Sequence, residues 1–172
     1  ELTALFVFLR PLGLRLTWGD TIKLWIFCWI GNLIGSLICV GIFQLTGIPT
    51  AGEGEVAAYF TQVSVGKVGY APLPLLARAV FCNILVCLAV WCGTKLKSES
   101  GKLIMIFWCI FVFMVCGFEH SIANMSIEGV ALANGGITIG QYCYSVLLAT
   151  VGNMIGAIVF VTLPYHLISK EK

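Results

Sequence analysis

Apolar residues run through this chain in long stretches, without regular alternation between apolar and polar positions. Residues 24–52, 79–94, 103–118 and 129–169 contain no charged side chain. A helix crosses the hydrocarbon core of a bilayer in about 20 residues. The strands of a membrane barrel would instead alternate lipid-facing and lumen-facing positions. The pattern therefore predicts an all-α polytopic membrane protein.

The polar interruptions divide the chain into elements of one transmembrane domain, residues 1–172. We predict a half-helix at 1–10 and helices at about 21–46, 73–93, 103–133 and 140–168. The segment 47–72 is rich in Gly, Pro and Glu, so we expect an irregular segment on the outer side. The helix at 103–133 is interrupted near 117–124, where Glu119, His120 and Asn124 place polar groups at membrane depth.

Composition and charge support a membrane protein and suggest its orientation. Hydrophobic residues make up 59% of the chain and charged residues 10%, and the mean hydropathy is +0.99. A soluble domain carries about 25% charged residues. With alternating crossings, the Lys and Arg residues other than Lys67 and Arg78 fall on one side. The positive-inside rule makes that side cytoplasmic, so we expect a plasma (inner) membrane protein with a cytoplasmic C-terminus.

Two helices repeat the same pattern. Residues 29–40 align with 150–161 and share Gly-Asn, Ile, Gly and a final Val. The second helix comes three crossings after the first, so the two run in opposite directions and form an inverted-topology repeat. A Gly-rich packing motif that arose twice by chance is the alternative. The repeat also predicts a second break at Glu1-Leu2-Thr3, to match Glu119-His120-Ser121. We interpret Glu1 as an internal position of a longer protein, with at least one crossing upstream.

His120 is the main candidate for chemistry. Ionisable groups inside the membrane are costly and usually face a pathway, and histidine exchanges protons near physiological pH. The alternative is a histidine that only bonds backbone freed by the break. For Glu119, and for Glu1 in the other half, we expect a structural role in holding freed N–H groups or a neighbouring subunit, with direct contact to the substrate as the alternative. Lys67 would raise the local anion concentration at an outer vestibule, unless it is an ordinary surface lysine.

Amide side chains within the apolar helices have two possible roles. They either bond neighbouring helices together or line a polar stripe in a pore. The residues concerned are Asn32, Asn83, Asn124 and Asn153.

The sequence shows no recognisable motif for binding a metal or a cofactor. Its eight cysteines form no C-x-x-C pair, and inside apolar runs cysteine behaves as a small hydrophobic residue. His120 and His166 lie too far apart along the predicted helices to share a metal. Asp20 is the only aspartate and falls in a predicted cytoplasmic turn, so no Ser-His-Asp set is available. We expect no cofactor and no metal. A scaffold protein and a membrane enzyme remain the alternatives to a transporter.

The motifs together resemble a known family. Residues 117–125 (GFEHSIANM) resemble the fifth-helix signature of formate/nitrite transporters, and residues 82–91 resemble the fourth-helix signature. The Thr17-Trp18-Gly19 turn and the two Gly-Asn helices follow in the same order. The resemblance implies a homopentamer in the lipid bilayer, with an aquaporin-like protomer of six helices, of which the first helix and a half are absent here. It also implies transport of formate, nitrite or hydrosulfide, often with a proton, and no nucleic-acid partner.

The resemblance also assigns site residues. His120 matches the central pore histidine, with Asn124 following it in the motif. Lys67 precedes Asn83 by the spacing of the family's vestibule lysine. The apolar positions that narrow the pore correspond to Phe113 and Val86, and the loop that breaks the second helix corresponds to Leu2 and Thr3. That loop departs from the usual Glu/Asp-Leu-Phe-Thr, which leaves the constriction on its side open. The short link at 134–136 favours the nitrite or hydrosulfide branch over the formate branch.

Overall fold

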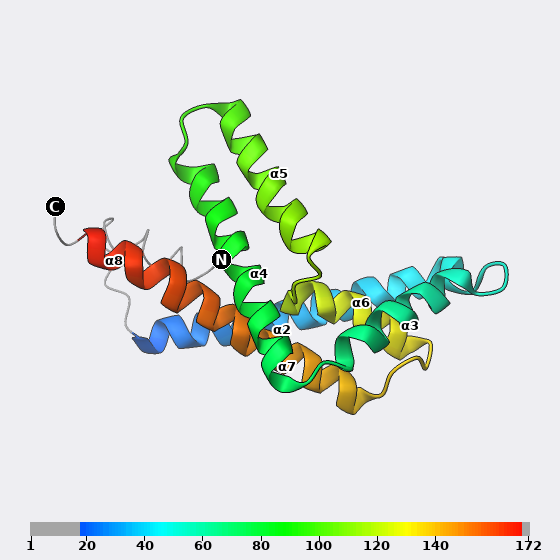
Figure 1. Cartoon of the computed structure of the whole chain (residues 1–172). Helices are drawn as coiled ribbons and strands as arrows, with labels where there is room; N and C mark the ends of the chain where they lie inside the picture. The colour runs from blue at the N-terminus through cyan, green and yellow to red at the C-terminus, as the bar shows by residue number, and fades with distance from the viewer. Residues whose placement is uncertain (1–17, 170–172) are drawn as a thin grey trace.

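The computed structural model describes residues 18–169, and in this part of the chain all regular secondary structure is helical, without strands (Figure 1). The elements in order are α2 (Trp18–Leu45), the 3₁₀ turn η2 (Ile48–Thr50), α3 (Glu55–Val68), α4 (Pro72–Lys95), α5 (Glu99–Val115), α6 (Ser121–Ala133), α7 (Ile139–Ile155), the π-helical segment η3 (Gly156–Thr162) and α8 (Leu163–Ser169). The predicted half-helix at 1–10, with Glu1, Leu2 and Thr3, lies outside the described residues.

Local sequence explains where several helices begin. Pro72 opens α4, a position where the N–H that proline lacks would have had no intrahelical partner. Ser98 caps α5 by accepting a hydrogen bond from the Gly101 N–H over 3.2 Å. At α7, Thr138 and Gln141 form a reciprocal capping box, which satisfies N–H groups that a helix start leaves open.

Three helical stretches are long and apolar enough to cross a membrane: Gly19–Leu45, Pro72–Lys95 and Ile139–Tyr165. Large apolar side chains on α2 and α5 point outward, among them Phe27 and Leu103, which are 74% and 70% exposed. Such surfaces are unfavourable in water but cost nothing against hydrocarbon. The exposed apolar faces therefore fit lipid as the surrounding solvent.

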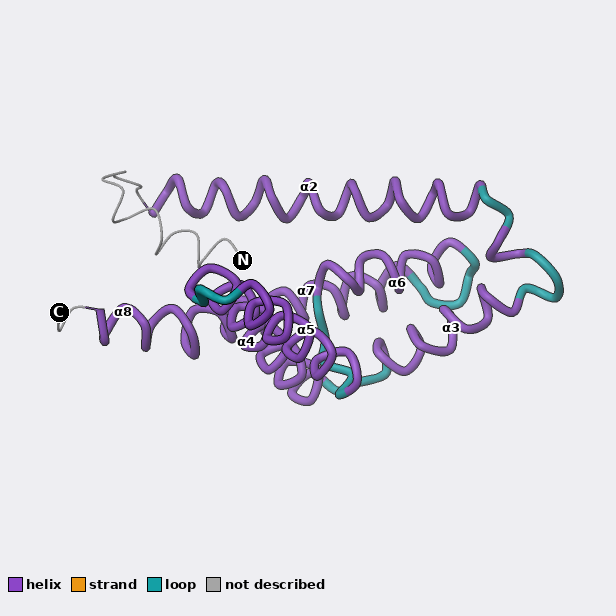
Figure 2. Tube along the Cα trace, turned by 90° about the horizontal axis from the view of Figure 1, so that it is seen from above, coloured by secondary structure: helices purple, strands orange, loops and turns teal. Residues whose placement is uncertain are grey.

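The helices cross in a way that brings distant segments together (Figures 1 and 2). α2 runs antiparallel to the line formed by α7, η3 and α8, while α4 and α5 form an antiparallel hairpin. The short helix α6 packs against α2, α3 and α7. One apolar cluster joins these elements, and it contains Val68, Met125, Ala131, Ile137, Tyr142 and Val146. A second cluster joins α4 to α7 through Leu75, Ala79 and Ala149.

The structure differs from the sequence-based elements in several places. The breakers at 47–54 do end α2, but the rest of the segment expected to be irregular folds as the 14-residue helix α3. α5 begins at Glu99 rather than near 103, because Ser98 caps it. The final helix is not regular: Pro164 cannot donate to the residue four positions earlier, and the turns just before it are π-helical.

Candidate functional site

The predicted break lies between α5 and α6 and is short, covering residues 116–120. Gly117 adopts φ 63°, a conformation that glycine reaches without steric cost. The N–H of Phe118 bonds the Phe113 carbonyl over 3.0 Å, and that of Gly117 bonds the Met114 carbonyl over 3.1 Å. This pair of bonds is the Schellman arrangement that closes a helix. The chain then leaves α5 and re-enters helix at Ser121.

Asn153 of α7 holds this break in place. Its side-chain Oδ1 accepts a hydrogen bond from the Ser121 N–H over 2.9 Å. Its Nδ2 donates to the Glu119 carbonyl over 2.9 Å and to the Ala79 carbonyl of α4 over 2.8 Å. One buried amide thus satisfies backbone groups of two other segments. Asn153 thus holds a freed N–H group of the break, which is one of the structural roles expected of Glu119.

His120 is the N-cap residue of α6. Its Nδ1 accepts a hydrogen bond from the Ala123 N–H over 3.2 Å. Its ring stacks on the Phe113 ring of α5, with 6.0 Å between centroids and 28° between planes. The imidazole is half-buried. The break therefore presents a titratable ring beside the apolar side chain predicted to narrow the pathway.

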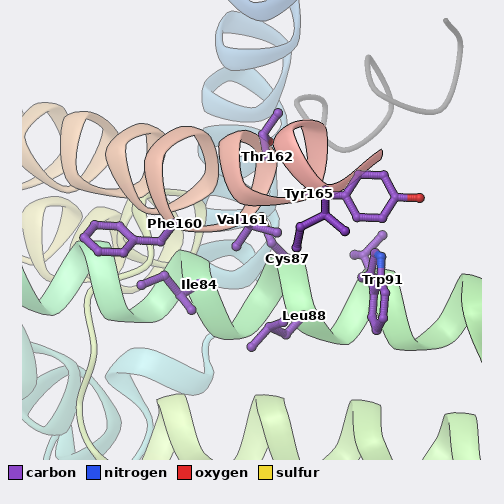
Figure 3. Close-up of a pocket in the computed structure, with 10 residues that line it drawn as sticks. Ile84, Cys87, Leu88, Trp91, Phe160, Val161, Thr162 and Tyr165 are labelled. Carbon is purple, nitrogen blue, oxygen red and sulfur yellow. The ribbon is translucent and has the colours of Figure 1, made fainter. Parts of the chain in front are cut away.

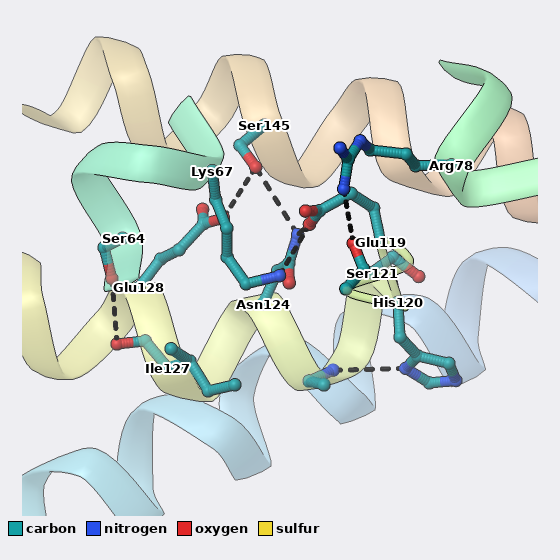
Figure 4. Close-up of polar contacts among 12 residues, drawn as sticks. Ser64, Lys67, Arg78, Glu119, His120, Ser121, Asn124, Ile127, Glu128 and Ser145 are labelled. Atoms are coloured by element: carbon teal, nitrogen blue, oxygen red, sulfur yellow. Dashed lines mark hydrogen bonds and ion pairs between the residues drawn. The ribbon is translucent and has the colours of Figure 1, made fainter. Parts of the chain in front are cut away.

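The carboxylate of Glu119 belongs to a buried ion pair (Figure 4). Lys67 Nζ, at the last turn of α3, lies 2.8 Å from Glu119 Oε2, and the two side chains are 16% and 1% exposed. Asn124 Nδ2 donates to the same carboxylate oxygen over 2.7 Å. Lys67 is therefore not an ordinary surface lysine: its charge is matched by Glu119 inside the protein.

The polar network continues through two residues that sequence reasoning missed. Asn124 Nδ2 also lies 3.5 Å from Ser145 Oγ of α7, and Ser145 Oγ donates to Glu128 Oε1 over 2.6 Å. Asn124, Ser145 and Glu128 are all fully buried. Glu128 stands four residues after Asn124 on α6, so both side chains share one helix face. That spacing was the signal available in the sequence.

The two predicted constriction residues do come together. Val86 of α4 and Phe113 of α5 share a buried cluster with Cys82, and Phe118 packs against it. Phe118 also stacks on Phe81, with 5.6 Å between ring centroids. The apolar cluster therefore lies next to the break and to His120.

Two remaining polar residues of α4 bond backbone around the break. Asn83 Nδ2 donates to the Asn153 carbonyl over 2.6 Å. Arg78 Nη1 donates to the Gly117 carbonyl over 3.0 Å, and its guanidinium carbon lies 4.3 Å from the centroid of the Tyr70 ring. Both side chains are half-buried. In the other repeat, Asn32 donates to the Cys28 carbonyl of its own helix.

A separate apolar cavity of about 270 Å³ lies between α4 and the line of η3 and α8 (Figure 3). Its lining is largely hydrocarbon and aromatic, including Ile84, Leu88, Trp91, Phe160 and Tyr165. None of its lining residues belongs to the polar network at the break. Its chemistry suits apolar groups rather than an anion.

Comparison with known proteins decides the family. The family model described as formate/nitrite transporter matches residues 3–167.

The chain belongs to the formate/nitrite transporter family.

Relatives of this member of the family include proteins named for both anions. A probable formate transporter of Methanothermobacter thermautotrophicus is 34% identical over 90% of this chain and 63% of the relative. The formate channel FocA of Escherichia coli strain K12 is 33% identical over 72% of this chain and 43% of FocA. The nitrite transporter NirC of the same strain is 30% identical over 80% of this chain and 51% of NirC. The chain spans less than two thirds of the length of the curated relatives it matches.

Solved structures show the same fold. A pentameric formate channel with formate bound superposes with a TM-score of 0.76 at 30% identity, over 90% of this chain and 69% of that one. An FNT family ion channel superposes with a TM-score of 0.82 at 24% identity, over 97% of this chain and 67% of that one. Membership in this family agrees with the sequence-based prediction of an integral multi-pass membrane protein that is not an enzyme.

Proposed function

We propose that the protein conducts small monovalent anions of weak acids across the membrane, together with a proton. The observation that carries this proposal is His120, a half-buried imidazole at a helix break, stacked on Phe113 at 6.0 Å between ring centroids. Phe113 and Val86 form an apolar constriction beside it. A bare anion is strongly disfavoured in such surroundings, whereas the neutral acid passes more easily. Proton exchange next to the constriction would supply that neutral form.

The wider pathway is part of the same proposal. Lys67, Asn83 and Asn124 would border the route, together with Leu2 and Thr3, which lie outside the described residues. Asn124 is fully buried, so it would act by orienting Glu119 rather than by touching the anion. Formate, nitrite and hydrosulfide are the candidate anions. The link between α6 and α7, residues 134–138, is short, which favours nitrite or hydrosulfide.

The proposed assembly is a homopentamer in the plasma membrane, with a cytoplasmic C-terminus. Support comes from the similarity to a pentameric formate channel and from the lysines at the α4–α5 turn and the chain end. Each protomer would be an aquaporin-like inverted repeat of six helices. The antiparallel course of α2 and α7 (Figure 2) supports this, because inverted repeats place equivalent helices in opposite directions.

The test is uptake of formate, nitrite and hydrosulfide by proteoliposomes, with internal pH followed at the same time. We expect saturable uptake that carries protons in the unaltered protein. His120→Asn keeps an N-cap acceptor for the Ala123 N–H but cannot titrate, so it should abolish the proton-coupled component. His120→Phe should do the same and also lose about 1 kcal/mol of stability, because the cap is gone.

His166→Asn is the matched control, since it replaces the other histidine of the chain in α8. It should leave uptake and proton movement as they are. If uptake is unchanged in both His120 variants, the assignment of the pathway to His120 is wrong. A scaffold would show no uptake at all, with any variant.

A further inference from the structure

Glu128 is a second buried carboxyl group in the polar network, and the proposed function makes no use of it (Figure 4). Its side chain is fully buried in α6. Oε1 accepts a hydrogen bond from Ser145 Oγ over 2.6 Å. Oε2 is buried and has no hydrogen-bond partner among the described residues. Half of the carboxyl group is therefore left without a donor or an acceptor.

A second buried oxygen nearby also lacks a hydrogen-bond partner among the described residues. Asn124 stands four residues before Glu128, one helical turn away on the same face. Its Nδ2 is used by Glu119 and Ser145, whereas its Oδ1 is buried without a partner among the described residues. Buried polar atoms in folded proteins nearly always have a partner. Two buried acceptor atoms on one helix face, both without a donor, indicate that one of them carries a proton.

The charges around Glu128 point the same way. Glu119, at the end of the break, carries one negative charge, and Lys67 of α3 already pairs with it at 2.8 Å. From α7, Tyr142 faces α6 and donates its hydroxyl to the Met125 carbonyl over 3.1 Å. From α2, the uncharged Val40 lies against Gly129. Arg78 of α4 donates to the Gly117 carbonyl at the break, and Lys67, the cation of the network, is engaged with Glu119.

We propose that Glu128 is a proton-binding site, held as a neutral carboxylic acid at the buried end of a chain that runs from Lys67 through Glu119, Asn124 and Ser145. A protonated Oε2 is a donor, and the Asn124 Oδ1 in the preceding turn is an acceptor that needs one. The single proton also removes the second negative charge, which burial away from a cation makes costly. The expected effect on transport rests on the proposed function, whereas the proton-binding site itself does not.

The consequence concerns transport. When Glu128 loses its proton, a second negative charge appears, separated from Glu119 by the side chains of Asn124 and Ser145. That charge opposes the entry of an anion and competes with Glu119 for Lys67. Uptake should therefore fall as the pH rises far enough to ionise Glu128. This dependence would add to that of His120.

Infrared difference spectroscopy of the reconstituted protein tests the site directly. We expect a C=O stretching band of a protonated carboxylic acid that shifts in ²H₂O and disappears in Glu128→Gln. Glu53→Gln, which alters an exposed carboxyl group, is the matched control and should keep the band. Persistence of an unchanged band in Glu128→Gln would overturn the proposal, as would absence of the band in the unaltered protein.

A second variant keeps the test decisive if Glu128→Gln does not assemble. Ser145→Ala retains the carboxyl group and removes its hydroxyl donor, so the band should remain but move in frequency. A band that does not respond to Ser145→Ala would contradict the site. In uptake assays, Glu128→Gln mimics the neutral acid and should lose the part of the decline at high pH that Glu128 causes, keeping only the part that depends on His120. Absence of uptake in the unaltered protein would count against the proposed function, whereas the infrared band judges Glu128 alone.

Discussion

The indole Nε1 of Trp29 donates a hydrogen bond to Thr150 Oγ1 over 3.0 Å, although 121 residues separate the two along the chain. Trp29 and Thr150 are the first residues of the two copies of the internal repeat, 29–40 and 150–161. Equivalent residues of an inverted repeat can touch each other only where the pseudo-two-fold axis passes. The contact therefore supports a repeat that is structural and not a chance recurrence of glycines.

This contact should be measurable by a double-mutant cycle of Trp29→Phe and Thr150→Val. Each single change removes one partner of the bond. We expect a coupling energy of about 0.5–1.5 kcal/mol between the two positions, from thermal unfolding in detergent. Pairing Trp91→Phe with Thr150→Val is the control, because Trp91 instead packs against Tyr165. Equal coupling in both cycles would mean that the bond adds nothing specific.

The Lys67–Glu119 ion pair should be far more sensitive to the loss of one partner than to the loss of both. Lys67→Met leaves a nearly fully buried carboxylate without its cation, at an expected cost of about 3–5 kcal/mol. Adding Glu119→Gln removes the orphaned charge and should restore at least half of the loss. The quantity to measure is the free energy of unfolding of both single variants and the double variant.

The exposed pair Lys102–Glu99 provides a matched control. Its atoms also approach closely, at 2.7 Å, but the Glu99 side chain is 83% exposed. Lys102→Met should cost less than about 1 kcal/mol, because water screens such pairs. If Lys67→Met were equally mild, the buried pair would not hold the break.

Asn153 should be among the least replaceable residues of α7. Asn153→Ala leaves the Ser121 N–H and the carbonyls of Ala79 and Glu119 without this partner, and we expect a loss of about 2–5 kcal/mol. Asn153→Asp keeps an acceptor for Ser121 but loses both donor hydrogens, so it should also be destabilised. Asn134→Ala is the comparison: Asn134 Nδ2 donates to the Val130 carbonyl one turn earlier, and its loss should cost about 1 kcal/mol. Equal costs would contradict the anchoring role.

Gly152 should tolerate no side chain, because α4 passes directly over it. A Cβ at this position would lie 2.5 Å from the Ala79 Cβ and 2.8 Å from the Leu76 carbonyl oxygen. Gly152→Ala should therefore destabilise the protein by about 1–3 kcal/mol. Gly41→Ala in α2 meets nothing within 4 Å in the described structure and should be neutral or stabilising by up to about 1 kcal/mol. Melting temperatures of the two variants decide the point.

Much of the fold could be predicted from the sequence, because its signals are local. Hydropathy over some twenty residues identified the long helices. Glycine with polar residues at 117–120 located the break that separates α5 from α6. The helix α3 escaped prediction: Gly47, Pro49, Gly52 and Gly54 lie just before it, and they masked a regular helix behind them. The part of the predicted site at Leu2 and Thr3 lies outside the described residues.

The sequence by itself determined that this is a helical membrane protein of the formate/nitrite transporter family, with a histidine at a helix break. Only the tertiary structure decided the partners of the polar residues: Glu119 with Lys67, Asn153 with the backbone of the break, and Glu128 with Ser145. These contacts join residues 52, 32 and 17 positions apart. Such pairs depend on how helices rotate and cross when they pack, and hydrophobic patterning sets which segments enter the membrane but not which polar groups then meet inside it.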